Sequence, residues 1–183
     1  MSSSVQQMIS KTWKAAINLR QATDKQLKAV LLQLADELEK NSAAIIKANQ
    51  LDVEKQDPNN PRVDRLLLNK QRIAGIANSI RTISKLPNPA GKTLEKRRLD
   101  NGLLLHKIAV PLGVVGAIYE SRPNVTYDIA ALCIRSQNGC VLKGSSEADN
   151  SNLGRNLWLE NLKANWLSCS SINAEADSSG SIT

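Results

Sequence analysis

The stretch GVVGAIYESRPNVTYDIAALCIRSQNGCVLKGSSEA, residues 113–148, decides the fold of this chain. It begins with an apolar run, Val114 to Tyr119, followed by a polar loop, Glu120 to Asn124. A helical pattern of apolar residues then leads to a second apolar run, Cys140 to Leu142, which ends in Lys143. Strand, loop, helix and strand at this spacing predict a βαβ unit with two parallel strands.

Polar side chains gather where the two predicted strands end, and ligands of parallel sheets bind beyond the carboxyl ends of the strands. Arg122 can grip a carboxylate or phosphate with two hydrogen bonds, and Asn124 can cap the helix or donate to a developing oxyanion. Lys143, at the second strand end, is a point charge suited to phosphate or ribose hydroxyls. A capped loop with an exposed arginine, and a lysine reaching from a strand end to solvent, explain these residues equally well.

The chain before this stretch is predicted to be mostly helical. Thr23 and Gln26 have the spacing of a capping box at the start of one helix, and Asn41-Ser42 breaks that helix and is placed to cap the next. After the turn-rich loop 56–62, Asn69 is placed to cap another helix. The helical stripes are interpreted as core packing. They comprise Val5, Met8, Ile9, Trp13 and Ala16; Leu27, Val30, Leu31, Leu34 and Leu38; and Ile73, Ile76, Ala77, Ile80 and Ile83.

A two-stranded ribbon is predicted between the helices and the βαβ unit. Residues 94–99 and 103–110 look extended and flank Asp100-Asn101-Gly102, in which Asn-Gly favours a hairpin turn. The only histidine of the chain, His106, lies in the second of these strands. It is given no catalytic role, and a single histidine excludes a two-histidine metal site; no metal site is predicted.

Composition limits the classes of function. With 183 residues, 42% of them hydrophobic and none of them Phe, the chain can build a packed aliphatic core. The net charge of +7 is compatible with nucleic-acid binding, but the basic residues are scattered and few aromatic residues are present to stack on bases. Basic residues on solvated helix faces are therefore the preferred explanation of the charge, and an anionic small-molecule ligand is also compatible with it. No apolar run approaches the length of a membrane span, and no membrane partner is expected.

The three cysteines, Cys133, Cys140 and Cys169, do not look like nucleophiles. Cys133 falls on an apolar helical pattern and Cys140 begins a buried strand, where thiols are usually inert. Cys169 lies in a polar segment with no identifiable base nearby. Three cysteines without a CxxC pair or a secretory signal predict a reducing, cytoplasmic location.

The stretch resembles the glutamate-5-semialdehyde dehydrogenases, also called γ-glutamyl phosphate reductases, of the aldehyde dehydrogenase superfamily. The likeness rests on PLGVVGAIYESRPNVT (111–126) and IAALCIRSQNGCVLKGSSEA (129–148). It continues upstream in LADELEKNSAAIIKANQLDV (34–53), VDRLLLNKQRIAGIANSIR (63–81) and LDNGLLLHKIAVPLGVVG (99–116), so that it covers roughly residues 5–152 in order.

This resemblance implies an α/β fold: amino-terminal helices, a partial Rossmann-like parallel sheet of the aldehyde dehydrogenase type, and a β-hairpin ribbon. It implies an oxidoreductase of proline biosynthesis that uses NADPH to reduce γ-glutamyl phosphate to glutamate 5-semialdehyde, with release of phosphate. In the family, a cysteine thiolate attacks the acyl phosphate, and hydride from NADPH reduces the resulting thioester. A small-molecule substrate is the expected partner, and a homo-oligomer is compatible with the resemblance.

The resemblance also assigns residues. Lys143, Ser146 and Glu147 match the cofactor-binding strand end and turn, and Arg122 and Asn124 are the substrate or oxyanion candidates. Two departures bear on cofactor affinity. Gln137 stands where the family usually has glycine, so the turn before the second strand is expected to be strained, and Ser145 replaces the second glycine of the usual KGG or RGG.

The likeness stops near Asn152, which predicts two parts: residues 1–152, with the helices and the partial NADP-binding domain, and residues 153–183, a divergent, disordered tail. The catalytic cysteine of the family belongs to a downstream domain and matches none of the three cysteines here. The chain is therefore expected to be truncated and inactive alone. The alternative is a non-catalytic fragment that binds nucleotides or associates with nucleic acid.

Overall fold

The computed structural model describes residues 2–57, 59–60, 63–120, 122–145, 148, 151 and 172–173. Helices come first, in agreement with the sequence prediction. They are α1 (Ser2–Leu19), α2 (Asp24–Lys40), α3 (Ser42–Val53), the single turn α4 (Val63–Leu66) and α5 (Lys70–Lys85). The ribbon follows, as β1 (Thr93–Arg98) and β2 (Leu104–Ile108). The βαβ unit is β3 (Val114–Ile118), α6 (Pro123–Arg135) and β4 (Gly139–Lys143).

Of the predicted helix caps, those of Thr23 and Asn69 are present. Asn41 makes no side-chain cap hydrogen bond to α3, because its amide donates back to Glu37 of α2. Asn124 lies inside the first turn of α6 and does not cap it. The backbone N–H of Gln26 donates to the Thr23 hydroxyl over 3.3 Å, and the backbone N–H of Thr23 donates to the Gln26 amide oxygen over 2.8 Å. These two bonds complete a capping box at the start of α2. The Asn69 side chain accepts from the backbone N–H of Arg72 over 2.8 Å at the start of α5. Both caps satisfy backbone donors that a helix start leaves unpaired.

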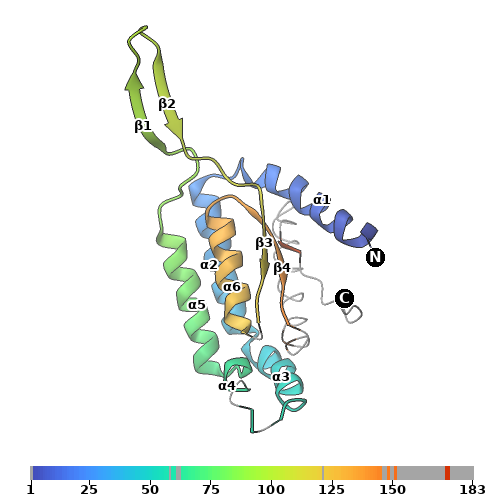
Figure 1. Cartoon of the computed structure of the whole chain (residues 1–183). Coiled ribbons are helices and arrows are strands. Elements are labelled where there is room, and N and C mark those ends of the chain that lie inside the picture. The colour runs from blue at the N-terminus through green and yellow to red at the C-terminus, as the bar shows by residue number, and fades with distance from the viewer. Residues whose placement is uncertain are drawn as a thin grey trace.

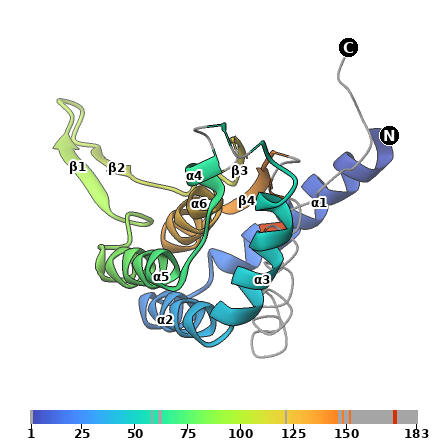
Figure 2. The ribbon, with the colours of Figure 1, turned by 90° about the horizontal axis from the view of Figure 1, so that it is seen from below.

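The core lies where α2, α5 and α6 pack together and α6 covers one face of the strands. Figure 2 shows α6 between the α2–α5 pair and the strands, with α1 beyond the strands. The stripes predicted for α2 and α5 are buried here, which confirms their interpretation as core. The large side chains that are completely or almost completely buried include Leu27, Leu31, Leu34, Leu38, Ile73, Ile80, Ile134 and Leu142.

The sheet is parallel, as the βαβ pattern predicted. β3 pairs with β4 in a register that runs from Val114 opposite Gly139 to Ile118 opposite Lys143. A short strand β5 (Ile172–Asn173) pairs in parallel with the other side of β4. These two residues belong to the predicted tail; the rest of that prediction falls outside the described residues. Helices, parallel strands and ribbon together confirm the predicted α/β fold class.

The ribbon is antiparallel, also as predicted, and it extends away from the helices and the sheet (Figure 1). Every residue of its two strands is exposed. His106 lies opposite Lys96 within it. The ribbon therefore contributes nothing to the core of the described chain.

The prediction that the apolar stripe of α1 packs in the core is wrong for its larger residues. Val5, Ile9 and Trp13 each keep 47% of their surface exposed, and only Ala16 of the predicted set is fully buried. The reason is that α1 packs on the strands through its second half, where small side chains allow a close approach. A Cβ atom added to Gly139 of β4 would lie only 2.9 Å from the Thr12 side chain.

The turn between α6 and β4 is conformationally strained, as the sequence predicted. Gln137 has φ of 59°, the left-handed region that side chains with a Cβ adopt at a cost. Its side-chain amide donates to the backbone oxygens of Arg20 (3.3 Å) and Ala22 (2.8 Å). These bonds tie the turn to the end of α1, so the glutamine supplies contacts that a glycine would lack.

Candidate functional site

A pocket of about 400 Å³ opens beyond the carboxyl end of β3, where α4, α5 and the start of α6 come together. Its volume lies within the usual range of small-molecule sites, about 300–1,000 Å³. Most of its lining side chains are polar or charged. They are Asp64, Arg65, Arg72, Gly75, Ile76, Ser79, Arg122, Asn124 and Asp128.

The structure brings two of the predicted site residues into this pocket. Arg122 immediately precedes α6 and Asn124 lies in its first turn, and both line the pocket. Lys143 lies at the end of the neighbouring strand β4, exposed, and does not line it. Ser146 and Glu147 lie outside the described residues. The predicted substrate side and cofactor side thus lie at the same edge of the sheet, one strand apart.

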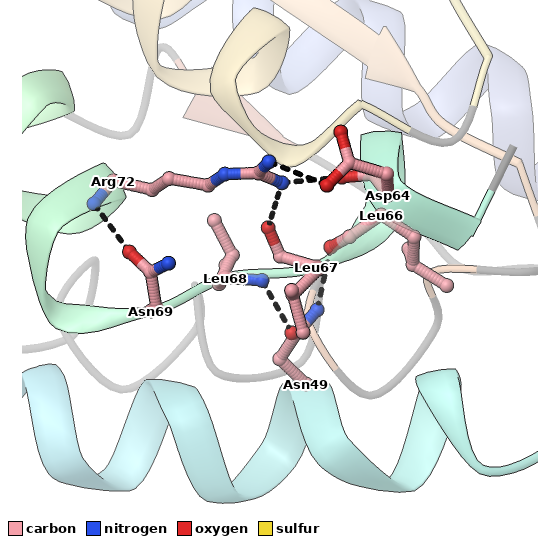
Figure 3. A network of polar contacts seen from close by, with 7 residues as sticks. All are labelled: Asn49, Asp64, Leu66, Leu67, Leu68, Asn69 and Arg72. Carbon is pink, nitrogen blue, oxygen red and sulfur yellow. Dashed lines mark hydrogen bonds and ion pairs between the residues drawn. The ribbon is translucent and has the colours of Figure 1, made fainter. Parts of the chain in front are cut away.

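Arg72 forms one side of the pocket, where several hydrogen bonds and an ion pair hold its side chain. Its guanidinium pairs with the Asp64 carboxylate over 2.7 Å and donates to the carbonyls of Asp64 and Leu67, the latter over 2.8 Å (Figure 3). These partners surround one side of the guanidinium and neutralise the Asp64 carboxylate. Arg72 and Asp64 therefore offer little unpaired charge to a ligand.

A buried asparagine, Asn49, holds the chain segment that binds Arg72. The side-chain amide of Asn49 in α3 donates to the Leu66 carbonyl over 2.9 Å, and its oxygen accepts from the Leu68 N–H over 2.7 Å (Figure 3). Asn49 has no exposed surface. It thereby anchors the segment between α4 and α5, which contains the Leu67 carbonyl that holds Arg72.

Two pocket charges have no partner of opposite charge in the described part of the chain. Asp128, half-buried on α6, accepts a hydrogen bond from the Ser79 hydroxyl over 2.8 Å, which is a neutral donor. Arg122 is exposed, and its guanidinium makes no hydrogen bond or ion pair with the described residues. The nearest approach of Arg65 to a carboxylate is 4.0 Å, to Glu120, and both side chains are largely exposed. Such a pair is weak in water.

Sequence reasoning missed the part of the pocket that comes from the helices. Ser79, Arg72 and Asp128 were left unassigned because their helices were interpreted only as core. A signal was present: Asp128 follows Asn124 by four residues, which places both on one face of α6. Arg72 and Ser79 are likewise seven residues apart, two turns along one face of α5.

The two cysteines that the structure describes are buried, as predicted. Cys133 is 6% exposed and Cys140 is fully buried. A hydrogen bond with Cys140 lowers the pKa of the Cys133 thiol below its ordinary value, while burial acts in the opposite direction. Neither thiol lines the pocket. Cys169 falls outside the described residues.

Thiol accessibility is a direct check on this burial. In a Cys169→Ser variant, Cys133 and Cys140 are expected to react with Ellman's reagent at least about a hundredfold more slowly in buffer than in urea, because reaction requires local opening. The absorbance of released thionitrobenzoate measures both rates. A thiol that reacts equally fast in both solvents would instead be an accessible nucleophile.

The described residues contain neither a cluster of metal-binding side chains nor a helix suited to span a membrane. No group of three or more His, Cys, Asp or Glu side chains there is arranged to hold a metal ion. Within the same residues, no helix combines the length and apolar character needed to cross a bilayer.

Comparison with known proteins shows similarity to one group of enzymes. No protein-family model matches the chain. The chain is 48% identical over 153 residues to a γ-glutamyl phosphate reductase of Chlorobium phaeobacteroides. This match covers 84% of this chain and 37% of that protein. It is 50% identical over 140 residues to the corresponding protein of Chlorobium chlorochromatii, with 76% and 34% covered. The chain thus spans just over a third of these curated relatives.

Solved structures agree. The crystal structure of γ-glutamyl phosphate reductase from Thermotoga maritima superposes with a TM-score of 0.88 at 30% identity, covering 95% of this chain and 43% of that one. A probable aldehyde dehydrogenase from Listeria monocytogenes gives a TM-score of 0.69 at 15% identity, with 94% and 36% covered. The second match concerns the fold alone.

Proposed function

Since this chain is homologous to the amino-terminal part of γ-glutamyl phosphate reductases, we propose that it forms the corresponding part of such an enzyme. The reaction is the NADPH-dependent reduction of γ-glutamyl phosphate to glutamate 5-semialdehyde and phosphate, in cytoplasmic proline biosynthesis. The observation that carries this proposal is the shared sheet edge. The pocket with Arg122 and Asn124 lies beyond β3, and Lys143 ends the next strand.

The chemistry of Lys143 fits a cofactor phosphate or ribose. Its side chain is exposed and has no hydrogen-bond or ion-pair partner within the described residues. Tyr119, at the end of β3, donates its backbone N–H to the Lys143 carbonyl over 3.1 Å, which holds the two strand ends together. NADPH, when bound, supplies the hydride. The role of Lys143 is to bind and orient it, and we assign the same role to Ser146 and Glu147.

On the substrate side, Arg122 and Asn124 are the proposed binding groups. Arg122 provides a guanidinium for an anionic oxygen, and Asn124 provides an amide donor for the oxygen of the reacting carbonyl. Because Cys133 and Cys140 are buried outside the pocket, we propose that neither is the nucleophile. We propose that Cys169, which does not match the catalytic cysteine of the family, is not the nucleophile either. We therefore expect no turnover by this chain alone, because the covalent step needs an accessible thiolate.

The test of the cofactor site is the Lys143→Ala variant. We expect the dissociation constant for NADPH to rise about tenfold to a hundredfold, because a charge-assisted contact contributes about 1.5–3 kcal/mol. Titration calorimetry of the 183-residue chain measures it. Lys107→Ala, an exposed lysine on the ribbon, is the matched control and should leave the affinity unchanged.

If both lysine variants lose NADPH affinity equally, the cofactor is attracted nonspecifically to the basic chain and does not bind at a defined site. If wild-type protein binds no NADPH at all, the cofactor role is wrong. Comparison with NADH checks the proposed preference for the phosphorylated cofactor.

A further inference from the structure

We infer that the pocket recognises the amino-acid end of the substrate, with Asp128 binding its α-ammonium group and Arg122 its α-carboxylate. Asp128 would then be a specificity-determining residue that selects a glutamyl group over a plain dicarboxylic acid. This inference rests on the proposed function, because it takes the glutamyl group as the ligand. It goes further in assigning the pocket to the end of the substrate that does not react.

Asp128 carries a charge that no cation of the described residues compensates. Its carboxylate oxygen Oδ1 accepts from Ser79, and no described cation pairs with it. The side chain is half-buried, so an ion pair formed there is less screened than one at the open surface. A small cation with several N–H donors satisfies such a carboxylate. The ammonium group of an amino acid has this chemistry.

Arg122 carries the opposite charge, likewise without a partner among the described residues. Among the three arginines of the pocket, Arg72 is held by Asp64 and the Leu67 carbonyl, so it is not free to bind an anion. Arg65 is directed toward Glu120, at 4.0 Å. The guanidinium of Arg122 has neither restraint, and its planar fork matches a carboxylate.

A zwitterion explains the whole lining better than a simple anion does. A site for phosphate or a dicarboxylate alone gains nothing from Asp128, whose charge would repel such ligands. One unpaired carboxylate and one unpaired guanidinium in the same pocket match a ligand that carries both signs. Asn124, one turn before Asp128 on the same face of α6, remains available for a carbonyl oxygen farther along the ligand.

The experiment compares L-glutamate with glutarate, which is the same dicarboxylate without the ammonium group. Binding to the full 183-residue chain is followed by NMR chemical-shift titration. We expect the wild type to prefer L-glutamate. We expect Asp128→Asn to weaken L-glutamate binding about tenfold to a hundredfold and to leave glutarate unchanged or slightly improved.

Asp128→Asn is a conservative change, because the amide oxygen can still accept from Ser79. The matched control is Asp100→Asn in the exposed ribbon turn, which removes the same charge far from the pocket. It should leave the affinity for both ligands unchanged. Arg122→Gln should weaken both ligands, because both carry carboxylates.

Three outcomes would overturn the inference: no saturable binding of L-glutamate, no preference for it over glutarate, or equal effects of Asp128→Asn on both. An Arg122→Gln variant with unchanged affinities would remove the carboxylate assignment. The proposed function is judged separately by the NADPH titration. Glutamate selectivity without NADPH binding would leave the pocket assignment standing and sink the reductase role, and the reverse result would do the opposite.

Discussion

Asn49→Leu is expected to lower the free energy of unfolding by about 3 kcal/mol, because it leaves two buried backbone groups without partners. The Leu66 carbonyl loses its donor and the Leu68 N–H loses its acceptor (Figure 3). Leucine has the same number and branching of side-chain heavy atoms as asparagine, so the substitution opens no cavity and the loss includes the missing hydrogen bonds. Urea unfolding followed by circular dichroism of the helices measures the change.

The control for this variant is Gln50→Leu, the next residue of α3, whose side chain is exposed. It should change stability by no more than about 0.5 kcal/mol, as surface substitutions usually do. Asn49→Leu should also weaken L-glutamate binding, since the segment that it loosens holds Arg72 and Asp64 in the pocket wall. If the two variants unfold at the same urea concentration, the Asn49 bonds contribute nothing.

Leu34→Ala is expected to cost about 3–4 kcal/mol, because it removes a completely buried side chain at the meeting of α2 with the rest of the core. Its neighbourhood is built from rigid helices that cannot collapse fully into the space. The matched control is Leu32→Ala on the same helix, where 43% of the side chain is exposed. It should cost about 1 kcal/mol or less, since less apolar surface is lost from the interior.

The two leucine variants are compared by thermal and urea unfolding. A difference below about 1 kcal/mol would mean that α2 is not packed as described. Because Leu34 lies away from the pocket lining, folded Leu34→Ala protein should bind L-glutamate as the wild type does. This separates loss of stability from loss of the site.

Local signals in the sequence were sufficient for most of the fold. The capping box at Thr23, the cap at Asn69 and the Asn101-Gly102 turn each act over a few residues, so they can be recognised without tertiary information. The parallel pairing of β3 with β4 followed from the spacing of the two apolar runs and the helical pattern between them. Arg122 and Asn124 were found because they stand at a strand end, where such sheets bind ligands.

The remaining features depend on contacts between distant segments. The exposure of Val5, Ile9 and Trp13 could not be predicted, because an apolar stripe specifies a face but not its partner. The Ser79–Asp128 bond joins residues 49 positions apart, and Asn49 contacts a segment beyond a long loop. No local pattern marks these pairs, because each residue alone looks like an ordinary polar helix position.

The sequence by itself therefore determined the helices, the ribbon, the βαβ unit and the two strand ends at which we propose that ligands bind, because backbone propensities and periodicity operate within a few residues. Only the tertiary structure decided that α4 and α5 close a pocket over the start of α6. It also decided which pocket charges are neutralised by neighbours and which are left for a ligand. Whether a charge is compensated depends on which groups lie next to it in space. Arg72 is paired with Asp64, whereas Asp128 and Arg122 have no oppositely charged partner among the described residues and are therefore the candidate binding groups.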